Sequence, residues 1–123
     1  MSAKSQHLVD QLGQLMECTQ RIHTVMLRYY DVCGDLASSI EHGVRALEAF
    51  ESAGGIGLRQ EITDDLGAFE AARHAVRVAL FALAGEEGTS ISDMGRALGI
   101  SRQLASRLAA EAKDPDPPSD PVV

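Results

Sequence analysis

Apolar residues recur at alternating spacings of four and three positions from residue 8 to residue 50. Eleven of these thirteen positions are apolar, although hydrophobic residues make up 45% of the chain and would fill about six by chance. The positions are Leu8, Leu12, Leu15, Thr19, Ile22, Met26, Tyr29, Cys33, Leu36, Ile40, Gly43, Leu47 and Phe50. This spacing is typical of helices that pack along a heptad repeat, so residues 1–53 are predicted to form a coiled-coil-like helical dimerisation region.

The form of this region depends on Gly34. Glycine closes many helices and Asp35 is a preferred N-cap residue, so the chain can turn back here as a helical hairpin. The heptad phase nevertheless continues through both Gly34 and Gly43, which favours one helix over residues 4–52, about 73 Å long. Either form exposes an apolar face that 123 residues can hardly cover. We therefore expect a homodimer that forms through residues 8–50.

Three glycines within residues 54–57 predict a boundary between two modules. Beyond them, apolar residues repeat at helical spacing over residues 58–83, and residues 63–65 (Thr-Asp-Asp) are able to cap and charge a helix start. This helix is expected to end within residues 85–88, where two glycines flank two glutamates. The sequence thus predicts a helix that leads into the C-terminal part of the chain.

Two further short helices are expected over residues 92–98 and 102–112, which completes a module of residues 58–113. Aromatic residues make up only 4% of the chain and Trp is absent, so the core must consist of the aliphatic residues that helices tolerate well. The fold class is therefore predicted to be all-α. Residues 114–123 contain four prolines and three aspartates, which predicts a disordered acidic tail.

Residues 91–110 have the features of two short helices that cross at a steep angle. Met94 and Leu98 would form the inner face of the first helix, and Gly95 would allow close contact between the helices. Gly99 can adopt the left-handed conformation of the turn. The remaining core and capping positions are Ile100, Ala105, Leu108 and the N-cap residue Ser101.

This pattern resembles the helix-turn-helix of bacterial transcription regulators, in its trihelical form without a wing. The resemblance covers about 20 residues, or about 40 if the preceding helix is included. It implies that the second helix, residues 101–112, lies in the major groove of double-stranded DNA. Two positions depart from the family: Gly95 stands where Ala is common, and Leu104 is bulkier than usual.

The resemblance also implies which side chains contact DNA. With the core positions turned inward, five residues of the second helix turn outward: Ser101, Arg102, Gln103, Ser106 and Arg107. Arginine can form two hydrogen bonds to guanine, glutamine can pair with adenine, and serine can reach phosphates or base edges. The sequence therefore predicts a sequence-specific DNA-binding transcriptional regulator that acts as a homodimer.

The charge distribution leaves a second interpretation open. The chain carries a formal charge of −7, and the four bases and four acids of residues 85–113 cancel. Contact with a few phosphates is feasible, whereas tight non-specific binding to nucleic acid is not expected. In the alternative, the chain is a helical protein–protein interaction module whose helix-turn-helix is a scaffold or docks on a partner protein.

Other functional classes have little support in the sequence. The four histidines are far apart, and Glu70 with His74 at one helical turn is typical of a surface pair, so neither an enzyme nor a cofactor or metal site is expected. The two cysteines lack CxxC spacing, and the polar N-terminal run predicts neither secretion nor membrane insertion. These features, with nine Arg against two Lys, are expected of a soluble, cytoplasmic bacterial protein.

Overall fold

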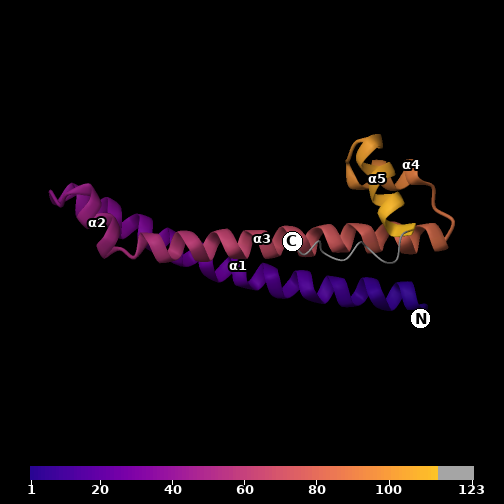
Figure 1. The fold of residues 1–123 in the computed structure, drawn as a ribbon, viewed down its shortest axis with the longest axis horizontal. Coiled ribbons are helices and arrows are strands. Elements are labelled where there is room, and N and C mark those ends of the chain that lie inside the picture. Colours follow the sequence, from indigo (N-terminus) through magenta and orange to yellow (C-terminus); the bar gives the residue numbers. More distant parts are fainter. Residues whose placement is uncertain (114–123) are drawn as a thin grey trace, which may run out of the picture. The chain divides into compact units, whose positions relative to one another are not determined.

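The computed structural model describes residues 1–113, which form five helices and no strand (Figure 1). The predicted all-α fold class is therefore confirmed. The helices are α1 (Ala3–Glu41), α2 (Ala46–Ser52), α3 (Gly55–Glu86), α4 (Ile91–Leu98) and α5 (Arg102–Lys113). None of these five helices is long and apolar enough to cross a membrane. The predicted acidic tail, residues 114–123, lies outside the described residues.

Helix α1 matches neither of the two forms expected for the N-terminal region. It continues through Gly34 and ends at Glu41, and the chain turns at Gly43, which has a φ of +87°. The N–H of Val44 donates a hydrogen bond to the carbonyl oxygen of Ser39 at 3.0 Å, which is the six-to-one bond of a Schellman C-cap. Gly43 adopts this left-handed conformation without the steric cost that a Cβ atom brings, so the helix ends there.

Helix α3 begins inside the glycine cluster that was expected to separate two modules. Gly54 turns the chain with a φ of +76°, whereas Gly55 and Gly57 already lie in the first turn of α3. Residues 63–65 lie within the helix and do not cap its start. The hydroxyl of Thr63 instead donates to the carbonyl oxygen of Arg59, one turn earlier, at 2.9 Å.

The described helices belong to two compact units. The first unit consists of Met1–Gln14 and the chain from Ala72 onward, and the second unit is Leu15–Ala71. Helices α1 and α3 each contribute one part to each unit. The modules expected from sequence are residues 1–53 and 58–113, and each is a continuous stretch of chain. They place the whole of α1 in one module and most of α3 in the other.

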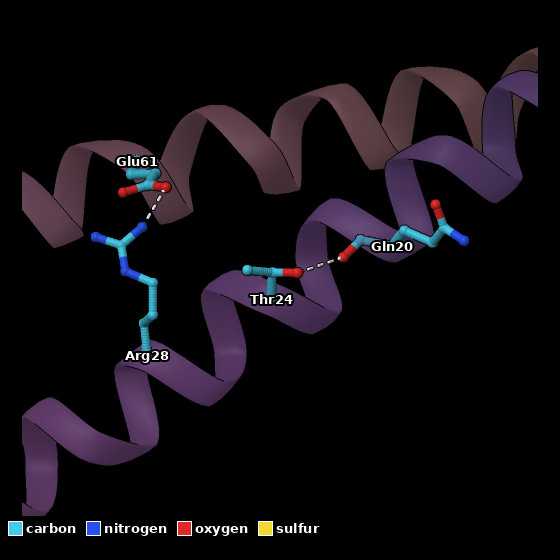
Figure 2. Close-up of polar contacts among 4 residues, drawn as sticks. All are labelled: Gln20, Thr24, Arg28 and Glu61. Carbon is cyan, nitrogen blue, oxygen red and sulfur yellow. Dashed lines mark hydrogen bonds and ion pairs between the residues drawn. The ribbon is translucent and has the colours of Figure 1, made fainter.

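In the second unit, α1 and α3 lie side by side and antiparallel. Arg28 of α1 forms an ion pair with Glu61 of α3 at 2.6 Å, as Figure 2 shows. Ten residues earlier in α1, the Cys18 thiol contacts the carbonyl oxygen of Ala68 at 3.8 Å, further along α3. The ion pair is about half exposed and contributes at most about 1 kcal/mol. Burial of apolar side chains such as Val25, which is 1% exposed, therefore stabilises this helix pair more.

Helix α2 packs back onto the start of α3 in the same unit. Ala49 is 1% exposed, and the ring of Phe50 lies directly over Gly55. A Cβ atom at Gly55 would lie 2.4 Å from the ring carbon Cε1 of Phe50, which is far inside van der Waals contact. A side chain at this position would therefore require the Phe50 ring to move, whereas the backbone conformation of Gly55 is an ordinary helical one.

In the first unit, α4 and α5 pack against the C-terminal part of α3. The fully buried cluster consists of Phe81 from α3 and Ala105, Leu108 and Ala109 from α5. Partly buried apolar residues surround this cluster: Val78, Met94, Leu98, Ile100, Leu104 and Ala112. The end of α3 thus supplies the third wall of a small three-helix core.

Gly34 and Gly43 allow a direct test of where the N-terminal helix ends. Replacement of Gly43 by Ala should destabilise the protein by about 1 to 2 kcal/mol, because Ala does not readily adopt a positive φ. Gly34→Ala should stabilise it by up to about 1 kcal/mol, since a Cβ atom there meets no neighbour and Ala favours helix. Urea unfolding of both variants measures the difference. A loss of stability in Gly34→Ala would instead support a turn at that residue.

Candidate nucleic-acid interface

The turn between α4 and α5 has the conformation expected from the sequence. The two helices span Ile91–Leu98 and Arg102–Lys113, within one residue of the predicted bounds. Gly99 has a φ of +68°, which is left-handed, and its N–H donates to the carbonyl oxygen of Arg96 at 3.2 Å. The N–H of Ile100 donates to the carbonyl oxygen of Gly95 at 3.1 Å, so the end of α4 is closed by a Schellman motif.

Serine side chains cap the start of both helices. The Ser101 hydroxyl accepts a hydrogen bond from the N–H of Leu104 at 3.1 Å, which confirms it as the predicted N-cap of α5. Ser90 caps α4 in the same way by accepting from the N–H of Asp93 at 3.0 Å. The sequence analysis missed this second cap, although Ser90 followed three residues later by Asp93 is the pattern that indicates it.

Gly95 sets how closely α4 approaches α5. It is buried, and a Cβ atom built on it would lie 3.2 Å from the Cβ of Ala105. The predicted role of Gly95 as the small residue at the helix contact is therefore confirmed. Ala, which is common at this position in helix-turn-helix proteins, would fit only if α4 or α5 moved by a few tenths of an ångström.

Burial of one side of α5 determines which of its side chains face outward. Ala105 and Leu108 are each 1% exposed and Ala109 is 8% exposed. Leu104 is half-buried and packs against this cluster, so its bulk is used within the core. The five residues expected to contact DNA are all exposed: Ser101, Arg102, Gln103, Ser106 and Arg107.

The arginines of this region differ in their partners. Arg96 of α4 forms an ion pair with Asp93, one turn earlier in the same helix. Arg102 and Arg107 form no ion pair with any residue of 1–113. Their guanidinium groups are therefore not engaged by carboxylates in the described part of the chain, and each can offer a planar pair of donors to an external ligand.

His74 connects α3 to the last turns of α5. Its Nε2 atom lies 2.8 Å from a carboxylate oxygen of Glu111, and both side chains are about half exposed. The sequence analysis considered His74 only together with Glu70 and missed this contact, because the two partners are 37 residues apart. The half-exposed pair joins α3 to α5, and Glu111 lies one helical turn after Arg107.

An open cleft of about 760 Å³ also lies in the first unit. Its walls include Phe81, Ile91 and Met94, and two lysines, Lys4 and Lys113, border it together with Glu86. Within residues 1–113, no group of three or more His, Cys, Asp or Glu side chains is placed to hold a metal ion.

Comparison of the chain with protein-family models, with curated proteins and with solved structures finds no match.

Gly95 gives a test of whether α4 and α5 depend on their close contact. Gly95→Val should destabilise the protein by about 1 to 3 kcal/mol, because the added methyl groups would collide with Ala105. Ala97→Val is the matched control, since Ala97 lies exposed on the same helix and should lose only about 0.6 kcal/mol or less of helix propensity. Thermal unfolding followed by circular dichroism measures both, and equal losses would contradict the role of Gly95.

Proposed function

We propose that the protein is a sequence-specific, double-stranded-DNA-binding transcriptional regulator that acts as a homodimer, with α5 as its recognition helix. The observation that carries this proposal is the outer face of α5. Arg102 and Arg107 lie exposed there without an ion-pair partner among residues 1–113, on a helix that is capped, packed and joined to α4 by a tight turn.

The spacing of the exposed residues on α5 suits the reading of base edges. Four of the exposed residues are separated by one, three and one positions along the chain, so they share one helical face. They are Arg102, Gln103, Ser106 and Arg107. A major groove is wide enough to admit an α-helix, and arginine and glutamine are the side chains that pair with guanine and adenine through two hydrogen bonds. This face therefore combines donors and acceptors suited to a short base sequence.

Residues 85–113 carry no net charge, which limits the kind of DNA binding that we propose. The four bases and four acids of residues 85–113 cancel, and Arg96 is already paired with Asp93. Attraction to DNA phosphates must therefore come from two or three contacts per subunit rather than from a broad basic surface. Specific contacts with bases then have to supply much of the affinity. This favours a sequence-selective protein over a non-specific DNA-binding protein.

The homodimer is part of the same proposal because one recognition helix reads only a few base pairs. Two copies would bind two half-sites about one helical turn, or a multiple of it, apart. Linking the two binding events raises the effective concentration of the second head at its half-site. A dimer thereby recognises a longer DNA sequence, although each copy makes only a few phosphate contacts.

The alternative is a protein-interaction module, and exposed apolar residues on α1 favour it. Met16 is 68% exposed and Tyr30 is 78% exposed, so α1 offers an apolar surface that a partner protein would cover. In this case α4 and α5 would serve as a scaffold or would dock on the partner. Selection of bound duplexes from a random-sequence DNA pool separates the two, because only a regulator enriches a common motif.

Two arginines test the recognition helix directly. Arg102→Ala and Arg107→Ala should each weaken binding to the selected duplex by about 1 to 3 kcal/mol, because each loses a hydrogen-bonded pair to a base. Arg59→Ala is the control, since it removes the same charge from an exposed position in the second unit. Fluorescence anisotropy with the selected duplex measures all three. Wild-type affinity in both α5 variants would exclude this face as the reading surface.

Salt dependence tests the number of phosphate contacts. Two or three contacts per subunit give about four to six per dimer, so a plot of log affinity against log salt should have a slope of roughly −4 to −5. Anisotropy titrations between about 50 and 200 mM salt measure this slope. A slope near −10 would contradict the limited phosphate contact proposed here, as would affinity that does not change with salt.

A further inference from the structure

Burial distinguishes two series among the apolar positions of α1, while Val9, Leu12, Leu27 and Tyr29 are exposed outside both. One series faces α3 in the second unit, where Cys18 and Val25 are buried and Ile22 is half-buried. The other series remains exposed and again follows spacings of three and four residues. We call it the outer stripe, and it consists of Met16, Thr19, His23, Met26, Tyr30, Cys33, Ala37 and Ile40.

The outer stripe is apolar over most of its length although no described helix covers it. Its most exposed large apolar side chains are Met16, 68% exposed, Tyr30, 78% exposed, and Ile40, 46% exposed. Single exposed apolar residues are common on soluble proteins, whereas a continuous line of them indicates a surface that binds another molecule. The stripe runs over 25 residues, which corresponds to about 36 Å of helix.

We propose that the outer stripe of α1 binds the outer stripe of a second copy of this chain. This inference rests on the homodimer of the proposed function and specifies the surface that forms it. The seam predicted from sequence mixed both series: Leu15, Ile22 and Leu36 are partly covered within the chain, whereas Met26 and Ile40 remain available. The proposed dimer surface therefore contains only some of the apolar residues of the predicted seam, residues 8–50, and lies on one side of α1.

The heptad spacing of the stripe favours another helix with the same spacing. Two helices form knobs-into-holes packing along their whole length only if both repeat their apolar residues every 3.5 positions. A second copy provides a helix with that repeat. The packing is then isologous, so that the same patch is covered on both subunits.

Charge also favours a second copy over a differently charged partner. No residue of the stripe is an acid, Lys or Arg, and the flank at Gln20, Leu27 and Gly34 carries no charge, whereas Glu41 follows these residues at the end of α1. The acids of this part of α1, such as Glu17 and Asp31, follow a different heptad position. Two copies of an acidic chain can therefore meet over most of the stripe without opposing like charges, and Glu41 at the end of α1 is the one acid on this flank.

The test measures the mass of the full-length protein in the absence of DNA. For the wild type at a protein concentration of tens of micromolar, light scattering should give the mass of a dimer. Tyr30→Glu and Met26→Glu should each weaken dimerisation by roughly a hundredfold or more, because each places a charge in the apolar contact. Leu47→Glu is the matched control: Leu47 is 71% exposed on α2 and belonged to the predicted seam, but it lies outside the outer stripe.

Cys33 provides a second readout that does not require a disruptive substitution. It is exposed in the single chain, whereas Cys18 is buried. Alkylation of Cys33 by iodoacetamide should therefore slow as the protein concentration rises through the dimerisation range, while Cys18 reacts slowly throughout. Mass spectrometry of each cysteine-containing peptide measures both rates, and circular dichroism confirms that the glutamate variants remain helical.

The outcomes separate this proposal from the proposed function. A monomeric wild type, a dimer that persists in Tyr30→Glu and Met26→Glu, or a Leu47→Glu variant that becomes monomeric would each overturn the outer stripe as the dimer surface. Labelling of Cys33 that does not depend on concentration would do the same. Arg102→Ala should leave the mass unchanged, so loss of DNA binding and loss of dimerisation are distinguished.

Discussion

The packing of α5 onto Phe81 is the contact on which the candidate site depends. Ala105, Leu108 and Ala109 occupy one side of α5 and are almost fully buried against the end of α3. This burial fixes the rotation of α5 about its own axis, because any other rotation would expose Leu108 to water. The outward direction of Arg102 and Arg107 is thus a consequence of apolar packing and needs no polar contact to maintain it.

The elements whose signals are local in sequence are those that the sequence predicted well. The bounds of α4 and α5 follow from Gly99 and Ser101, each of which satisfies backbone groups within four residues of itself. The same locality explains why the exposed residues of α5 could be named in advance. The His74–Glu111 pair could not, since it joins two helices that only the tertiary structure brings together.

The N-terminal region was harder to predict because its signals compete. Gly34 and Gly43 both lie within the same heptad pattern, yet only Gly43 adopts a positive φ and ends a helix. The apolar pattern was ambiguous in a second way. Residues on two neighbouring sides of α1 satisfy heptad spacing, and the sequence alone does not show which side α3 covers.

The buried residues of the first unit include unusually many alanines. Ala79, Ala84, Ala105 and Ala109 are all less than 9% exposed, and no buried polar group links the helices of the described chain. Alanine permits close helix contact but removes little apolar surface from water, so Phe81 and Leu108 provide most of the adhesion. The small size of these alanines therefore lets α5 approach α3 and α4 closely. A larger side chain at Ala105 would displace α5, and with it the direction of the exposed arginines on the candidate recognition helix.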